Sequence, residues 1–153
     1  MKTEMQVLER LRETMVSQLE AYIGTDDGQP SDAIGEDSVV IDFPDPDGMR
    51  KDTMMFIQPD AESLESLSMG SDLATMDAGI CILCKGAPNA VLVRRVFAWC
   101  NAFHRMIRSN PTLDGFIDAS MMTGMEYYPA VTASRTMTAI EIPLQLQWTK
   151  EFR

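Results

Sequence analysis

Residues 88–115 read PNAVLVRRVFAWCNAFHRMIRSNPTLDG, and the predicted fold is organised around this stretch. Its apolar side chains recur at spacings of three and four, which predicts a helix with one buried face. Pro88 suits the first turn because its missing N–H needs no partner there, and Ser109-Asn110-Pro111 ends the helix. We expect the buried face to consist of Val93, Val96, Phe97, Cys100, Phe103, His104 and Ile107.

Alternating sequences on both sides of this helix predict long strands. Residues 73–85 alternate before the helix, and we expect them to form a central strand. Residues 116–128 predict a second strand, broken by a bulge or bend at Gly124. Residues 136–148 alternate strictly and end in IEIPLQLQW. Pro143 cannot donate to a ladder, so this strand is expected at a sheet edge or to bulge there.

The N-terminal part of the chain predicts a second helix and two short strands. Residues 3–23 carry an apolar stripe at helical spacing, consisting of Met5, Leu8, Leu11, Met15, Leu19 and Tyr22. Thr3 is the expected N-cap, with Gln6 as its capping-box partner. The β-branched sequence of residues 39–43 predicts one strand, and residues 53–58 predict another.

The resulting order of elements is α-β-β-β-α-β-β. Pro59 is expected to close the second strand, and residues 60–72 fit either a short helix or an extended edge segment. This order predicts an α+β fold, with a mainly antiparallel sheet flanked by two amphipathic helices. We expect residues 1–153 to form a single domain, in which 25–38 and 44–52 are flexible acidic loops.

Length and composition fit one soluble globular domain. The chain has 153 residues, of which 45% are hydrophobic and 24% are charged. Residues 1–15 are charged throughout and lack the apolar centre of a secretory signal. No apolar run approaches the roughly 18–20 residues that a membrane span requires. We therefore expect neither secretion nor a membrane partner.

The charge is strongly negative and unevenly distributed. The chain carries 13 basic and 23 acidic residues, for a net charge of −10. Residues 78–153 have a net charge of +3, whereas residues 26–77 have a net charge of −12. Proteins that bind the phosphates of nucleic acids need a surface patch of basic side chains, so specific binding of nucleic acid is not expected. The acidic segment contains Asp26, Asp27, Asp32, Glu36, Asp37, Asp42, Asp45, Asp47, Asp52, Asp60, Glu62, Glu65, Asp72 and Asp77.

Cys81, Cys84, Cys100 and His104 have the residue types of a zinc site. Cys81 and Cys84 lie in an alternating strand, however, where residues three apart point to opposite faces. We therefore interpret the three cysteines as buried apolar residues, and a small zinc-binding module remains the alternative. The odd number of cysteines fits a reducing compartment.

Signals of catalysis are weak. No Ser, Cys or Thr has the context of an activated nucleophile, and His104 is expected in the core of its helix. The acidic turn at residues 42–48 lacks the spacing of a calcium loop and contains two prolines. We expect no catalytic residue, no metal and no cofactor.

The sequence resembles the tail terminator and tail-completion proteins of long-tailed bacteriophages. The similarity covers roughly residues 88–148, from the helix that runs into NPTLDG to the strand that ends IEIPLQLQW. An amphipathic N-terminal helix and an acidic region broken by Pro, Asp and Gly precede it. The chain departs from the family in its cysteine-containing strand and its long acidic segment.

The resemblance implies a structural virion protein without catalytic residues. Such proteins form a ring, typically a hexamer, that caps the tail tube and later meets the head connector or neck protein. DNA passes through the ring lumen without specific binding. The chain would then be in the virion, at the tail neck, and in the host cytoplasm during assembly. From the charge asymmetry we expect ring or tube contacts at Asp45, Asp47, Asp52, Arg94 and Arg95.

Two other functions remain open at this point. A neck, head-completion or tail tube protein of the same virion would have a similar composition. The zinc module built on the cysteines and His104 belongs to a different class.

Overall fold

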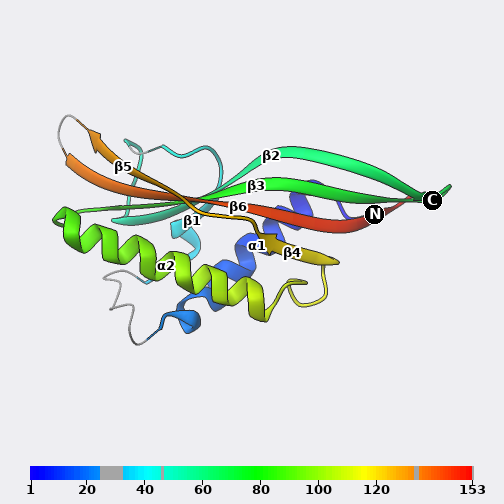
Figure 1. The fold of residues 1–153 in the computed structure, drawn as a ribbon, viewed down its shortest axis with the longest axis horizontal. Helices are drawn as coiled ribbons and strands as arrows, with labels where there is room; N and C mark the ends of the chain where they lie inside the picture. Colours follow the sequence, from blue (N-terminus) through cyan, green and yellow to red (C-terminus); the bar gives the residue numbers. More distant parts are fainter. Residues whose placement is uncertain (25–32, 46, 133–134, 153) are drawn as a thin grey trace.

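The computed structural model describes residues 1–24, 33–45, 47–132 and 135–152, and it has the expected α+β architecture (Figure 1). Six strands form one mainly antiparallel sheet in the order β1-β2-β3-β6-β4, with β5 also paired to β6. The parallel pair is β1 with β2. The elements are α1 (Glu4–Gln18), β1 (Val39–Ile41), β2 (Thr53–Ser68), β3 (Ser71–Lys85), α2 (Asn89–Ser109), β4 (Ala119–Met122), β5 (Glu126–Thr132) and β6 (Arg135–Glu151).

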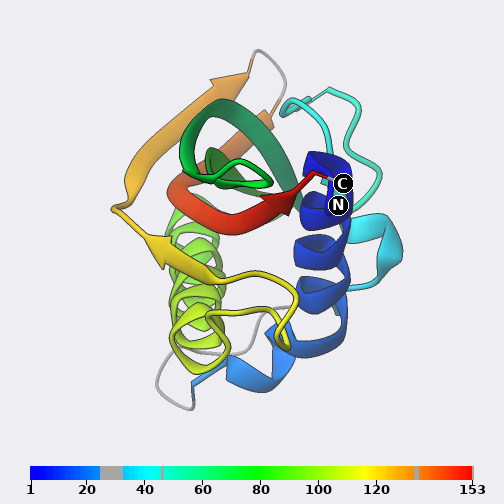
Figure 2. The same ribbon diagram turned by 90° about the vertical axis from the view of Figure 1, so that its right-hand side faces the viewer.

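Both helices lie on one face of a strongly curled sheet. Strands β2, β3 and β6 run along the length of the molecule, and α1 and α2 stand side by side beneath them (Figures 1 and 2). The main core lies between these layers, and its largest fully buried side chains include Trp99, Trp148 and Phe103. Even-numbered residues of β3 and β6 face the helices, as the predicted alternation requires.

Helix α1 begins as predicted. The Thr3 hydroxyl accepts a hydrogen bond from the Gln6 backbone N–H, and the Gln6 side chain accepts one from the Thr3 backbone N–H. This reciprocal capping box satisfies two otherwise unpaired donors. The α-helix ends at Gln18 and continues as a 3₁₀ turn over Leu19–Tyr22. Met5 was expected on the buried stripe but is exposed, and Val7 is buried instead.

Helix α2 has the predicted bounds, but its buried face differs from the prediction. Phe97 and His104 were expected in the core and are exposed. Phe97 instead stacks on Tyr127 of β5, with ring centroids 5.7 Å apart. The helix is turned so that another line of apolar side chains meets the sheet, namely Leu92, Val96, Trp99, Phe103 and Met106.

Strand β2 is much longer than predicted, because Pro59 does not end it. The register with β3 shifts between Pro59 and Ala61, and this irregularity accommodates the proline in a strand that continues to Ser68. Residues 60–68 belong to this strand, where they are exposed. The extended alternative is therefore correct and the helical one is wrong. Met69 and Gly70 form the turn into β3.

Strand β6 lies inside the sheet, so its predicted edge position is wrong. It pairs with β3 on one side and with β4 and β5 on the other. Pro143 faces Gly79 in β3 without a register shift, and its carbonyl oxygen accepts a hydrogen bond from Thr123 N at 2.9 Å. The N and C=O of a strand residue point to the same side. The missing donor of Pro143 therefore lies opposite the interruption between β4 and β5, which includes Gly124.

The predicted acidic loops are only partly described. Residues 25–32 and 46 lie outside the described residues. Within the rest of segment 25–38, Ile34 is buried in the main core and Glu36–Ser38 form a 3₁₀ turn. In the described part of the chain, no helix is long and apolar enough to cross a membrane.

Candidate functional site

The sheet face that is turned away from the helices carries a cluster of carboxylates. Asp60 of β2, Asp77 of β3, Glu126 of β5 and Glu141 of β6 line a hollow of about 600 Å³. Gln58 and Gln145 add polar groups, and none of the described residues that line the hollow is basic. We call this surface the acidic face.

The negative potential of the acidic face acts on a neighbouring thiol. Burial and, to a smaller extent, the charge of Glu141 together raise the pKa of Cys81 to about 11. The described residues contain no group of three or more His, Cys, Asp or Glu side chains that could hold a metal ion.

The sheet separates Cys81 from the other three residues of the zinc alternative. Cys81 packs with the small cluster on the helix-free face, whereas Cys84 lies in the main core on the opposite face. Cys84 Sγ lies 3.7 Å from Thr53 Oγ1. Cys100 of α2 lies 3.4 Å from Met125 Sδ, and burial raises the pKa of its thiol to about 11. His104 is exposed.

The predicted contact residues lie around one end of the sheet. Asp45 and Asp47 are exposed, and Asp45 Oδ1 accepts a hydrogen bond from Gly48 N at 3.2 Å. A Cβ atom added at Gly86 would lie only 2.7 Å from an oxygen of the Asp52 carboxylate. Gly86 has a positive φ of 84°, and α2 starts three residues later.

The basic members of that set project from the first half of α2. Arg94 is exposed and Arg95 is partly buried. Asp52 therefore lies near the start of the helix that carries both arginines, while their role in contacts between chains stays a prediction.

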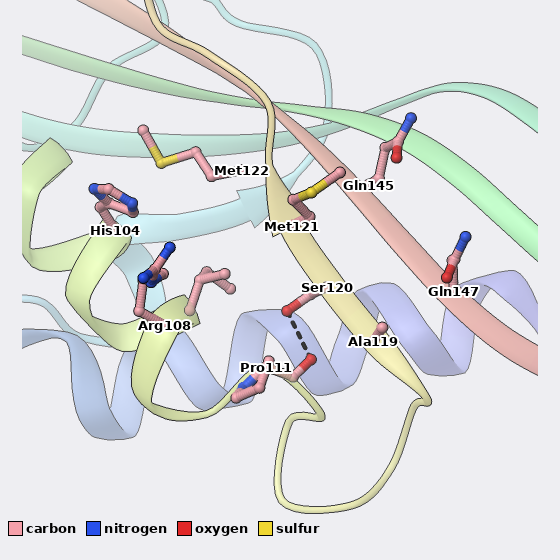
Figure 3. Close-up of a pocket in the computed structure, with 10 residues that line it drawn as sticks. His104, Arg108, Pro111, Ala119, Ser120, Met121, Met122, Gln145 and Gln147 are labelled. Carbon is pink, nitrogen blue, oxygen red and sulfur yellow. Dashed lines mark hydrogen bonds between the residues drawn. The ribbon is translucent and has the colours of Figure 1, made fainter.

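A groove beside β4 is a feature that sequence reasoning missed. It has a volume of about 440 Å³ and lies between the second half of α2 and the edge of the sheet (Figure 3). His104 and Arg108 point toward it from α2, and Ser120 bonds to the Pro111 carbonyl oxygen at 2.7 Å across its floor. The remaining lining residues are Ile107, Ala119, Met121, Met122, Gln145 and Gln147.

The signal for this groove was present in the sequence, in the spacing of two basic side chains. His104 and Arg108 are four residues apart and so share one helix face. Because His104 was assigned to the buried stripe, that face was interpreted as core.

Comparisons with known proteins give matches among solved structures alone. No protein-family model matches the chain, and a search of curated proteins gives no match. Among solved structures, the chain is similar to a chain from the "Virion of native gene transfer agent (GTA) particle". The two chains are 16% identical with a TM-score of 0.43, and the match covers 94% of this chain and 92% of the other.

Proposed function

We propose that the protein is a tail terminator of a long-tailed bacteriophage, a structural protein that closes into a ring on the end of the tail tube and helps to join tail to head. The observation that carries this proposal is the acidic face, whose hollow is lined by Asp60, Asp77, Glu126 and Glu141. The resemblance of residues 88–148 to this family supports it.

The acidic face has the property that a DNA passage needs. A strand of DNA passing through a ring must not adhere to the wall, and a carboxylate-lined wall repels phosphate. Repulsion acts over about 8 Å at physiological salt, so it operates at the surface of a narrow channel. We therefore assign the helix-free side of the sheet to the lumen and the helix side to the outside of the ring.

The role that we propose for this protein is not enzymatic. The described residues that line the acidic face and the groove beside β4 contain carboxylates and a histidine, but no nucleophile is paired with a base there. The role of the protein is to bind other copies of itself, the tail tube protein and the head connector or neck protein.

The test is deletion of the gene in a phage that encodes this chain, followed by electron microscopy of the tails. A terminator stops tube growth, so the deletion should give tubes longer than normal that do not join heads. Complementation with the wild-type chain should restore both properties.

Two outcomes would overturn the terminator assignment in favour of a related one. Tails of normal length that fail to join heads would assign the chain to the neck or to head completion. Absence of any tube would assign it to the tube itself. Normal virions from the deleted phage would reject all three roles.

A further inference from the structure

The sheet has two unlike edges that other strands can extend. One edge is the outer half of β2, residues 60–68, which we call the β2 arm. Among the described residues, β1 pairs with β2 only from Met55 to Ile57, well short of this arm. The other edge is β4, which pairs with β6 alone in the described part of the sheet. Edge strands present unpaired N–H and C=O groups, so each is a template for another strand.

The β4 edge opens into the groove beside α2. Thr123 N donates to Pro143 O in β6, and backbone groups alternate in direction along a strand. The backbone groups of Ser120 and Met122 therefore point away from β6. An extended segment placed along β4 would meet these groups and would lie against His104 and Arg108 (Figure 3).

The β2 arm and the groove beside β4 carry side chains of opposite charge. It carries three acids, Asp60, Glu62 and Glu65, and no base. The groove has Arg108 and His104 and no acid among its described lining residues. The arm is therefore complementary to the groove in charge.

One exposed apolar side chain of the arm fits the groove. Leu64 is 56% exposed, although it lies on the face of the sheet that is turned toward the helices, since its partner Ala74 is in the main core. Ser120 at the groove pairs with the core residue Leu146, so it lies on the same face of its sheet. In a sheet continued from β4 into the arm of another copy, Leu64 would enter the space between β4 and α2, against Ile107 and Pro111.

The arm is held in an extended form before any contact occurs. It pairs with β3 along its length, from Ala61 with Asp77 to Ser68 with Ser71. Glu62 also forms an ion pair with Lys150 of β6, at 3.1 Å. A preformed strand loses little conformational entropy on binding, which favours strand addition.

We propose that the β2 arm of one copy adds to β4 in the groove of the next copy, so that the sheets of successive subunits are continuous. This proposal rests on the proposed function, because it names the subunit contact of that ring. The two edges differ, so the contact is head-to-tail and repeats with a direction. Such contacts must either close into a ring or continue as a filament.

The contact can be trapped by a disulfide between copies. Leu64→Cys and Ser120→Cys, both on the helix side of the sheet, would be combined in one chain, and concentrated protein and isolated tails would be oxidised under mild conditions. We expect a ladder of covalent oligomers that ends at the ring size. Each variant with only one of the two substitutions is the matched control and should give at most dimers. No ladder in either sample would overturn the proposal.

Charge reversal gives an independent measurement. Arg108→Glu should weaken self-association by about tenfold or more in sedimentation velocity, because the groove would then present an acid to the acidic arm. Leu64→Ser should also weaken association, whereas Met5→Ser should not, since Met5 is similarly exposed on α1. Equal effects of the two serine variants, or no effect of Arg108→Glu, would contradict the proposal.

The two proposals fail separately. If deletion of the gene gives overlong tubes but Arg108→Glu and Leu64→Ser assemble normally, the terminator role stands and the arm contact is wrong. If the cysteine pair gives the ladder but the deleted phage has normal tails, the contact stands and the terminator role is wrong.

Discussion

We expect Lys150→Met to destabilise the protein at neutral pH and to have much less effect in acid. Lys150 near the end of β6 is only 8% exposed, although its amino group is charged. It forms an ion pair with Glu4 at the start of α1 and another with Glu62 of β2 at 3.1 Å. Methionine keeps the apolar stem of the side chain but leaves two carboxylates facing each other without a cation.

The magnitude follows from the burial of the three partners. Removing one partner of a fully buried ion pair costs about 3–5 kcal/mol. The side chains of Glu4 and Glu62 are 42% and 27% exposed, so water compensates part of the loss. We therefore expect a decrease of about 2 kcal/mol in the free energy of unfolding at pH 7.

The pH dependence has a definite sign. The hydrogen bond from Lys150 lowers the pKa of Glu4 below its ordinary value of 4.5, so its contribution is present above that pH and is lost as the pH falls through the lowered pKa. Burial alone would lower the pKa of Lys150, but hydrogen bonds to Glu4 and Glu62 raise it above 10.5. Its contribution is therefore lost only as the pH rises through that raised value.

Urea unfolding of wild type and variant at pH 7 and about pH 3 measures both quantities. Glu9→Gln is the control, because Glu9 is an exposed acid on the same helix and its loss should change stability by less than about 0.5 kcal/mol. A loss for Lys150→Met that is as large at pH 3 as at pH 7 would refute the electrostatic explanation. No loss at pH 7 would show that the ion pairs contribute nothing.

Three further predictions concern the thiols and the charge. Cys81 and Cys100 have pKa values of about 11, so few of these thiols are ionised at pH 7.5. Native protein should therefore react with iodoacetamide at least about a hundredfold more slowly than urea-unfolded protein. Rates of native and unfolded protein within tenfold of each other would be inconsistent with the burial described. Protein purified without chelator should contain no stoichiometric zinc, and one zinc per chain by elemental analysis, with unfolding on chelation, would revive the zinc module. Micromolar protein should not shift duplex DNA in about 0.15 M salt, and a shift would show that the acidic face does not govern contact with DNA.

The sequence was a good guide to the strands whose pattern has only one interpretation. Residues 73–85 and 136–148 alternate with apolar, often β-branched side chains, and both form long strands with the predicted faces. Period-two patterns determine the side on which each residue lies once the strand is known. The capping box at Thr3 was equally local and equally well predicted.

Features that depend on neighbouring elements could not be predicted. The polar sequence of the β2 arm fits a helix as well as a strand, and only its pairing with β3 selects the strand. For α2, a small rotation about its axis decides whether Phe97 or Trp99 is buried, and that rotation is set by packing on the sheet.

The candidate surfaces show the same limit. The acids of the acidic face come from β2, β3, β5 and β6, and no local motif connects them. The groove beside β4 requires an exposed His104, which the predicted helix orientation excluded. Charge asymmetry indicated an acidic region, but the arrangement of the sheet determined which acids share a surface.

The central position of β6 has a consequence for biosynthesis. This strand follows β3, β4 and β5 in the chain and pairs with all three. While the ribosome is still translating α2 and the strands after it, β3 lacks one neighbour and both β4 and β5 lack their only partner in the described sheet. Nascent chains therefore cannot present a finished β4 edge, so the proposed contact with the β2 arm can form only after β6 has emerged.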